Sequence, residues 1–344
     1  MMRSRPARAL SRLLAAAEQL LDRLRGRHRP RKEPPVLEPY LGYATPERLV
    51  LRGRFLSALK RATPQPDQSR WTNLRQMVRL FLTDEVAGVP VSARGVRALS
   101  DDEGYVRLEV PRHRSDRGWA RVVIAREAEP EGVPAEEAQV GLRALVPRKD
   151  ARLGVISDID DTILHTGAWR PVRMLWISLT GNVLTRQVYP DAAALLRSLC
   201  EKGRNPVYYV SSSPWNLHDF LGHLFRRADL PEGPMMLRDF GLSEGRIVSD
   251  SHGAHKGAAI DALLAANPRL PFVLLGDTGQ HDAEIYRAAA RRHPGRMRGV
   301  ALRTPGHGTD AADEVHIRAL REDGIPVHVG RTFTGALEAL GETG

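Results

Sequence analysis

The sequence predicts an α/β protein in which a smaller β-rich domain precedes a parallel sheet with helices on both faces. Two observations lead to this fold class. After about residue 149, short apolar strands alternate with amphipathic helices, the pattern of a parallel sheet. Before that point, from about residue 36, the hydrophobic period is two, as in half-buried β-strands. We therefore divide the 344 residues into 1–35, 36–148 and 149–344.

The composition is that of an ordinary globular chain. Hydrophobic residues make up 42% and charged residues 27% of the sequence. Cys200 is the only cysteine, which excludes an internal disulfide and a cysteine-based zinc site. No uninterrupted apolar run reaches the roughly 18 residues that mark a membrane-spanning helix. From these features we expect a cytoplasmic protein without a transmembrane segment.

Most of the positive charge lies in the N-terminal segment. Residues 1–32 hold ten Lys and Arg against two acidic residues, which accounts for eight of the ten net charges. Leucines at helical spacing, from Leu10 to Leu24, give this basic segment an apolar stripe, and prolines between 30 and 39 mark a linker. Such a helix suits an anionic membrane surface, with the protein peripheral on the inner face of the membrane. A packed helix or a solvated arm is an equal alternative, and nucleic-acid binding is the least favoured.

The segment 36–148 is predicted to form a small β-sandwich. A turn is expected over residues 100–105, and a helix or irregular strand over 71–81. The strands are expected at 49–56, 89–96, 106–110, 121–125 and 142–146. The strand at Gly88–Val91 and the turn after it resemble those of carboxypeptidase-regulatory and transthyretin-like sandwiches. Because no catalytic residue types cluster here, a binding or positioning module is favoured over a second enzyme.

The segment 149–344 is predicted to be the parallel sheet and its helices. The expected strands are 153–157, 207–210, 272–275 and a last core strand at 299–303. The expected helices are 190–202, 216–227, one that opens at Lys256, and 282–292. Pro190, with Asp191 in the first turn, marks the start of the first helix.

Polar side chains follow three of these strands. They are Asp158, Asp160 and Thr162, then Ser211, then Asp277 and Asp282. The carboxyl ends of parallel strands open on one crevice, where α/β proteins bind ligands. Acids crowded in such a place need a cation, and a hard divalent ion such as Mg²⁺ takes oxygen ligands. With Lys256 reaching in from a helix, the pattern predicts a phosphate-processing metal site.

These motifs resemble those of the haloacid dehalogenase (HAD) superfamily of phosphotransferases. Asp158-Ile159-Asp160-Asp161-Thr162 is similar to its Asp-x-Asp-x-Thr signature, and Ser211, Lys256 and Asp277…Asp282 are similar to its later motifs in order. Three segments resemble the App1-type phosphatidate phosphatase catalytic domain, a lipin-like family: 157–163, 208–217 and 276–286. The resemblance covers about residues 150–330. It implies a HAD-like Rossmannoid sheet with a small cap.

The resemblance implies roles for the residues of the first loop. Asp158 would be the nucleophile, which forms an aspartyl-phosphate and also binds Mg²⁺. Asp160 would be the general acid and then the general base, with its backbone carbonyl on the ion. Thr162 is expected to cap the loop as a structural residue, and Asp161 is expected to face away.

The later motifs receive roles in the same way. Ser211 would hydrogen-bond a phosphoryl oxygen, with Ser212 as the less favoured holder of that role. Lys256 would neutralise the phosphoryl group and pair with the nucleophile. Asp277 would bind Mg²⁺, and Asp282 would orient that ligand shell or a water ligand.

Candidate substrate-binding residues lie in two places. The segment 165–189 is too short for a large lid domain and mixes aromatic residues with arginines. Trp169, Arg173 and Trp176 in it suit a flap that dips into a lipid interface, with a flap packed on the sheet as an equal alternative. Arg303, at the end of a strand, is expected either to contact the substrate or to form a salt bridge.

Taken together, these features predict a phosphoric monoester hydrolase. The specific expectation is Mg²⁺-dependent hydrolysis of phosphatidate to diacylglycerol and phosphate at a membrane surface. One alternative keeps the chemistry and replaces the lipid with a soluble phosphomonoester. Another is a non-catalytic lipid-binding protein on the same fold.

Overall fold

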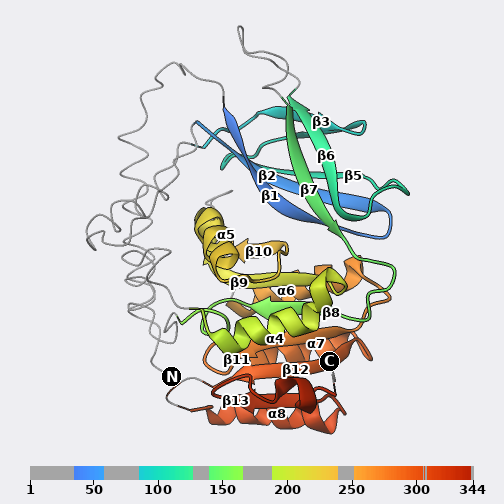
Figure 1. The fold of residues 1–344 in the computed structure, drawn as a ribbon. Helices are drawn as coiled ribbons and strands as arrows, with labels where there is room; N and C mark the ends of the chain where they lie inside the picture. The colour runs from blue at the N-terminus through green and yellow to red at the C-terminus, as the bar shows by residue number, and fades with distance from the viewer. Residues whose placement is uncertain are drawn as a thin grey trace, which may run out of the picture. The chain divides into compact units, whose positions relative to one another are not determined.

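The computed structural model describes residues 35–57, 85–126, 139–165, 188–238, 252–304, 306 and 308–341. Both sheets lie within residues 35–344, which form one compact unit (Figure 1). Several predicted features lie outside the described residues. They are the basic helix, the element expected over 71–81, and the flap residues Trp169, Arg173 and Trp176.

A six-stranded sheet forms the centre of the region that carries the acidic motif. Its strands are β8 (Gly154–Asp158), β9 (Val207–Pro214), β10 (Met235–Arg238), β11 (Phe272–Asp277), β12 (Met297–Arg303) and β13 (Val327–Gly330). They are all parallel, in the order β10-β9-β8-β11-β12-β13. The chain builds β9 and β10 on one side of β8 and then crosses to β11 on the other. The carboxyl end of β8 is therefore a topological switch point, where sheets of this kind bind ligands.

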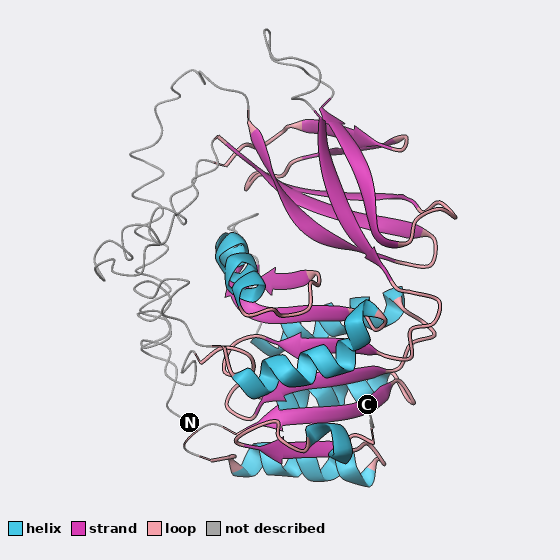
Figure 2. Cartoon of the chain, viewed as in Figure 1, coloured by secondary structure: helices cyan, strands magenta, loops and turns pink. Residues whose placement is uncertain are grey.

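Helices cover both faces of this sheet, as the sequence predicted (Figure 2). One layer consists of α4 (Pro190–Cys200), α5 (His218–Arg227) and the short α9 (Ala336–Ala339). The other consists of α6 (His252–Ala266), α7 (Asp282–Arg292) and α8 (Ala311–Glu322). Alternate residues of β9 divide between the two layers, with Tyr209 in the first and Tyr208 in the second. Both faces are buried, which is why β8 and β11 are almost wholly apolar up to their last residues.

The strand predicted at 299–303 is not the last of the sheet. It is part of β12, and β13 pairs with it in parallel beyond α8. The prediction missed β13 because its four residues are only half buried and give a weak apolar signal. The buried strand β10 was missed because its four residues are too short a run to show a period.

A second sheet is formed by the residues that precede Asp150. Its strands are β1 (Val36–Ala44), β2 (Arg48–Leu56), β3 (Pro90–Ala93), β4 (Val96–Leu99), β5 (Tyr105–Pro111), β6 (Gly118–Arg126) and β7 (Gln139–Val146). They form one sheet in the order β4-β3-β6-β7-β1-β2-β5. Strand β1 pairs antiparallel with β2 and parallel with β7 and so joins the two halves of this sheet. The edge strands β4 and β5 contact each other, so the sheet encloses a core of its own.

The single strand predicted at 89–96 is a hairpin. Arg94 and Gly95 both have positive φ, 47° and 78°, which is the geometry of a tight two-residue turn between β3 and β4. Arg94 also forms an ion pair of 2.6 Å with the buried Asp116. The turn therefore falls inside the predicted strand, because the sequence pattern did not show that the chain reverses at Gly95.

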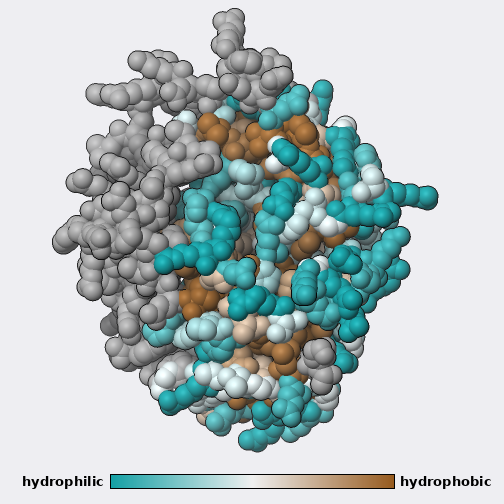
Figure 3. Space-filling model, viewed as in Figure 1, coloured by the Kyte–Doolittle hydropathy of each residue, from teal (hydrophilic) through white to brown (hydrophobic). Residues whose placement is uncertain are grey.

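The two sheets are in contact within residues 35–344. Tyr43 and Val50 belong to the core that also contains α6 and α7, and Arg143 of β7 forms an ion pair of 2.7 Å with Glu232. On the face drawn in Figure 3, hydrophilic side chains surround smaller apolar areas of the described surface. Within the described parts of the chain, every helix is too short or too polar to cross a membrane.

Candidate active site

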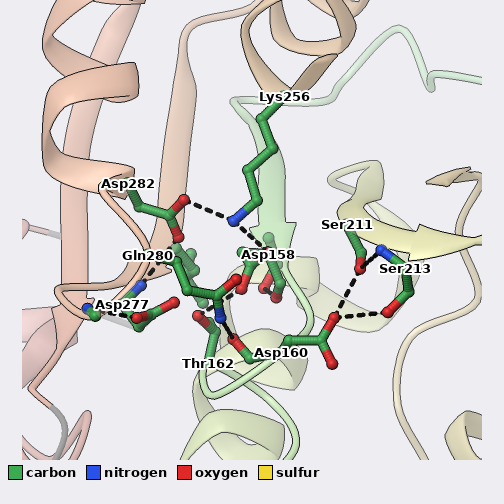
Figure 4. Close-up of polar contacts among 12 residues, drawn as sticks. Asp158, Asp160, Thr162, Ser211, Ser213, Lys256, Asp277, Gln280 and Asp282 are labelled. Carbon is green, nitrogen blue, oxygen red and sulfur yellow. Dashed lines mark hydrogen bonds and ion pairs between the residues drawn. The ribbon is translucent and has the colours of Figure 1, made fainter. Parts of the chain in front are cut away.

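Asp158 is the last residue of β8 and is 1% exposed. The Nζ atom of Lys256 lies 2.7 Å from Asp158 Oδ1 (Figure 4). Thr162 Oγ1 donates a hydrogen bond of 3.1 Å to Asp158 Oδ2. The carboxylate is thus held at both oxygens, at the switch point of the sheet.

The loop after β8 brings Thr162 back to Asp158. The backbone N–H groups of Ile163 and Leu164 both donate to Ile159 O at 3.0 Å. Asp161 adopts the left-handed conformation with φ 57°, which aspartate tolerates better than most residues. Thr162 was expected to act only as a loop cap. The structure places its hydroxyl on the carboxylate instead, because the loop folds into a tight turn.

Three carboxylates form one buried cluster at the ends of β8 and β11. One oxygen from each of Asp158, Asp277 and Asp282 lies within 4.8 Å of the others. Lys256 Nζ, which pairs with Asp158, is also 2.7 Å from Asp282 Oδ1. Asp277 Oδ1 accepts a hydrogen bond of 2.6 Å from Gly279 N, and Asp282 Oδ2 accepts one of 3.1 Å from Asp277 N.

This cluster fits a hard divalent cation. Asp277 Oδ2 is buried and has no hydrogen-bond partner among the described residues. The donors are all oxygens, and oxygen is the ligand type that Mg²⁺ requires. An unsatisfied buried carboxylate oxygen is costly unless a cation or a proton meets it. A bound divalent cation would therefore offset the excess negative charge of the three carboxylates.

The excess of buried negative charge also shifts the pKa values of the clustered residues. Burial raises the pKa of Asp158 to about 8, and the neighbouring Asp282 and Asp160 add to the rise against the opposing effect of Lys256. Burial, together with Asp282 and Asp158, also raises the pKa of Asp277. Burial alone would lower the pKa of Lys256, but the carboxylates raise it above its usual range, so the lysine stays charged. A single lysine does not neutralise three ionised carboxylates, so the protein without a metal ion must hold protons here.

Asp160 lies beside this cluster and has different partners. Ser211 Oγ and Ser213 Oγ each donate a hydrogen bond of 2.8 Å to Asp160 Oδ2. The backbone N–H of Ser213 donates to Ser211 Oγ at 2.9 Å, which links the two serines. The Asp160 carbonyl, expected on the metal ion, accepts a hydrogen bond of 3.1 Å from Gln280 Nε2. Asp160 and Asp158 therefore sit in separate environments two residues apart.

Ser213 and Gln280 are site residues that the sequence reasoning missed. Ser211 and Ser213 lie on one face of β9 because side chains alternate along an extended strand. Their spacing of two residues would have indicated this shared face if the predicted strand 207–210 had been extended to Pro214. Ser212 points elsewhere, and its buried hydroxyl has no hydrogen-bond partner among the described residues. No comparable sequence signal marked Gln280.

Arg303 forms the salt bridge that the sequence left as one of two alternatives. Its Nη2 lies 2.7 Å from Asp191 Oδ2, and its Nε donates to Thr162 O at 3.2 Å. The guanidinium also lies over the rings of Tyr189 and Phe333, at 3.9 and 4.5 Å. The residue is 3% exposed. These contacts make Arg303 a buried link between α4, the Asp158 loop and the C-terminal segment.

Residues 153–304 match the phosphatidate phosphatase APP1 catalytic domain. This range contains the three carboxylates, both serines and the lysine of the site. The expected resemblance to that catalytic domain is confirmed. The family is one of phosphatidate phosphatases, which are phosphoric monoester hydrolases.

Two curated relatives are each similar to somewhat less than half of the chain. The chain is 27% identical over 172 residues to phosphatidate phosphatase APP1 of Saccharomyces cerevisiae, which covers 48% of this chain and 29% of that protein. It is 27% identical over 152 residues to an uncharacterized protein of Schizosaccharomyces pombe, which covers 44% of this chain and 25% of that protein. The chain thus covers less than a third of the length of either relative.

Proposed function

We propose that this protein is a HAD-like, Mg²⁺-dependent phosphatase that hydrolyses phosphatidate to diacylglycerol and phosphate. The observation that carries the proposal is that Asp158 and Asp160 have different partners. The first carboxylate is paired with Lys256 in a cluster fit for a cation, and the second is held by two serine hydroxyls. Two carboxylates in contrasting environments are typical of a nucleophile and an acid/base pair.

In the first step, an Asp158 oxygen attacks phosphorus and forms an aspartyl-phosphate as the bond to the leaving alkoxide breaks. Asp160 donates a proton to that alkoxide. Both serines donate to Asp160 Oδ2, so we assign the transferred proton to Oδ1. Thr162 holds the other end of the nucleophile and limits its rotation.

In the second step, water attacks the phosphorus of the aspartyl-phosphate. Asp160, now ionised, takes a proton from that water, and the bond between phosphorus and the Asp158 oxygen breaks. Phosphate leaves, and both carboxylates return to their starting states.

Asp158, Asp277 and Asp282 would hold the Mg²⁺ ion, with the Asp160 carbonyl as a further candidate ligand. When bound, the ion supplies positive charge that offsets the repulsion between a carboxylate and a phosphate dianion. Lys256 adds a fixed positive charge at the same place. Ser211 has a single hydroxyl proton, so if it donates to a phosphoryl oxygen when the substrate enters, Ser213 alone keeps donating to Asp160 Oδ2 and still leaves Oδ1 for the transferred proton.

The lipid substrate is proposed from the similarity of residues 153–304 to the APP1 catalytic domain. The basic segment 1–32 and the flap residues Trp169, Arg173 and Trp176 would bring the site to an anionic membrane, as a cytoplasmic protein peripheral on its inner face. A soluble phosphomonoester is the second candidate substrate. The same site chemistry serves it, because the reaction takes place only at the phosphoryl group and its leaving oxygen.

Phosphate release from phosphatidate vesicles and from soluble esters tests the proposal, each with Mg²⁺ and with EDTA. We expect release from phosphatidate that requires Mg²⁺ and that Asp158→Asn lowers at least about a thousandfold. Asp261→Asn, which alters a carboxylate paired with Arg292 on the outside of α6, is the matched control and should retain activity. Release from soluble esters alone would reject the lipid substrate. An Asp158→Asn enzyme with the full rate would reject the mechanism.

A further inference from the structure

The carboxyl end of β9 leaves the active site directly toward the first sheet. Ser213 is followed by Pro214, the last residue of β9, and then by Trp215, which starts a short 3₁₀ helix, η2 (Trp215–Leu217). α5 begins immediately afterwards at His218. The contacts of Trp215 therefore fix the backbone just beyond the two serines.

Trp215 is held by residues of the first sheet. Its ring stacks on that of Tyr40 in β1, with centroids 4.7 Å apart and an interplanar angle of 16°. The guanidinium of Arg52 in β2 lies 5.1 Å from the Trp215 ring. Tyr40 and Arg52 are register partners across β1 and β2, so both present their side chains from one place on the sheet.

Arg52 connects this contact to the parallel sheet. Its Nη2 donates to Leu41 O at 3.3 Å and to Met235 O at 3.1 Å. Met235 lies in β10 beside Tyr209 of β9, so the arginine spans the first sheet and the strand next to the serines. Arg52 is half-buried, and its contacts within the described residues are with carbonyls and rings. Burying a guanidinium without a carboxylate is costly, and packing alone would be better served by an apolar side chain.

The aromatic stack continues into α5. The Tyr40 ring lies 4.3 Å from that of His218, and the Trp215 ring lies 5.8 Å from it. Burial, with Arg52 and Arg226 nearby, lowers the pKa of His218 to about 3, so the imidazole is neutral at physiological pH. A neutral ring adds no repulsion to Arg52. Trp215, at the start of η2, and His218, just past its end, are thus both packed against Tyr40.

We propose that the first sheet is a positioning element for the active site, which acts through the stack of Tyr40 and Arg52 on Trp215. Trp215 sets the path of the β9 end, that path sets the Ser211 and Ser213 hydroxyls, and the hydroxyls orient Asp160. The inference rests on the proposed function, because it concerns the proton that Asp160 transfers. Trp215 and Tyr40 are positioning residues and touch no reacting atom.

The test compares two substrates that differ in how much their leaving groups need a proton. An alkyl ester needs a proton from the general acid, whereas p-nitrophenolate is a stable anion and leaves with little help. A misplaced Asp160 therefore slows the alkyl ester selectively. We would measure kcat for short-chain phosphatidate and for p-nitrophenyl phosphate, both in solution, in the full chain and in Trp215→Leu and Tyr40→Leu.

We expect each variant to lose about tenfold or more in kcat on the alkyl ester and less than about threefold on the aryl ester. Ser213→Ala should show the same selectivity, and Trp215→Phe, which keeps a ring on Tyr40, should restore most of the alkyl rate. Trp119→Leu is the matched control. It removes another aromatic of the first sheet, one under Arg143 at 4.6 Å, and should leave the ratio of the two rates unchanged.

Equal losses on both esters, or no loss on either, would overturn the inference. A change of the ratio in Trp119→Leu would also overturn it, because the effect would then be a general one of the first sheet. If Trp215→Leu does not fold, as judged by circular dichroism, Tyr40→Leu and Arg52→Met, each of which removes one partner of the Trp215 ring, are compared with Ser213→Ala for the same ratio. A wild-type protein that releases no phosphate from either ester would instead reject the proposed function itself.

Discussion

Ser213 Oγ donates a hydrogen bond of 2.8 Å to Asp160 Oδ2, the same oxygen that accepts from Ser211. The carboxylate is thereby fixed on one side and lies beside, not within, the cluster of Asp158, Asp277 and Asp282. A general acid must present its proton in one direction, and two donors on one oxygen leave the other oxygen for that purpose. Ser213 is therefore part of the proposed acid/base machinery.

Replacing Ser213 with alanine should slow catalysis without unfolding the protein. We expect kcat for phosphatidate to fall about tenfold, because Asp160 loses one of two orienting donors. Ser212→Ala is the informative neighbour, since the Ser212 hydroxyl has no hydrogen-bond partner among the described residues. A greater loss in Ser212→Ala than in Ser213→Ala, measured by phosphate release, would reverse this assignment.

Replacing Lys256 with glutamine should destabilise the metal-free protein at neutral pH. Lys256 is 2% exposed and lies 2.7 Å from both Asp158 and Asp282, so its loss leaves buried negative charge uncompensated. Breaking such a pair costs about 3–5 kcal/mol in free energy of unfolding, which urea titration with EDTA would measure. Mg²⁺ should return part of this stability. The exposed Lys149→Gln is the control, and a comparable loss there would contradict the argument.

The stability of the metal-free protein should fall as pH rises from about 4 to about 8. Burial raises the pKa of Asp158 from 3.8 to about 8 and moves that of Asp277 in the same direction. The folded state therefore binds more protons than the unfolded state in this window, and that contribution is lost as pH rises through the folded pKa.

Thermal unfolding between pH 5 and 8.5, with EDTA and with Mg²⁺, measures this effect. Because metal binding requires ionised carboxylates, the increase in Tm that Mg²⁺ produces should grow with pH. Asp158→Asn removes one titrating group and should flatten the decline in EDTA. A Mg²⁺ effect that shrinks toward high pH would show that the cluster is not the ion's site.

Replacing Arg303 should affect stability far more than substrate affinity. Arg303 pairs with Asp191 at 2.7 Å and stacks on Tyr189 and Phe333, so Arg303→Met leaves Asp191 without its charged partner. We expect a loss of about 3 kcal/mol in free energy of unfolding with KM almost unchanged. Arg303→Lys should not restore the stability fully, because an ammonium lacks the planar fork. A large rise in KM would instead indicate the substrate contact that the sequence left open.

Much of the site was predictable from residue types at strand ends. Asp158, Lys256, Asp277 and Asp282 were predicted as one site, and the structure brings them together, because parallel strands place their carboxyl ends along one edge of a sheet. That regularity depends only on strand direction and alternation with helices, both of which are visible in the sequence.

Other features depended on local geometry that the pattern does not specify. The contact of Thr162 with Asp158 requires the turn at Asp161, and the contact of Ser213 with Asp160 requires β9 to stay extended to Pro214. Strand β1 was missed because Pro39 lies within a stretch that reads as a linker. Its parallel pairing with β7 joins β2 and β5 to the rest of the sheet.

By itself, the sequence determined the parallel sheet, the order of its motifs and the identity of the acids, since these follow from hydrophobic period and residue type. Only the tertiary structure decided that Asp160 and Asp158 have separate environments and that Tyr40 stacks on Trp215. The physical reason is that hydrogen bonds and ring contacts between distant segments depend on how the elements pack against one another. The periodicity of a single chain carries no information about that packing.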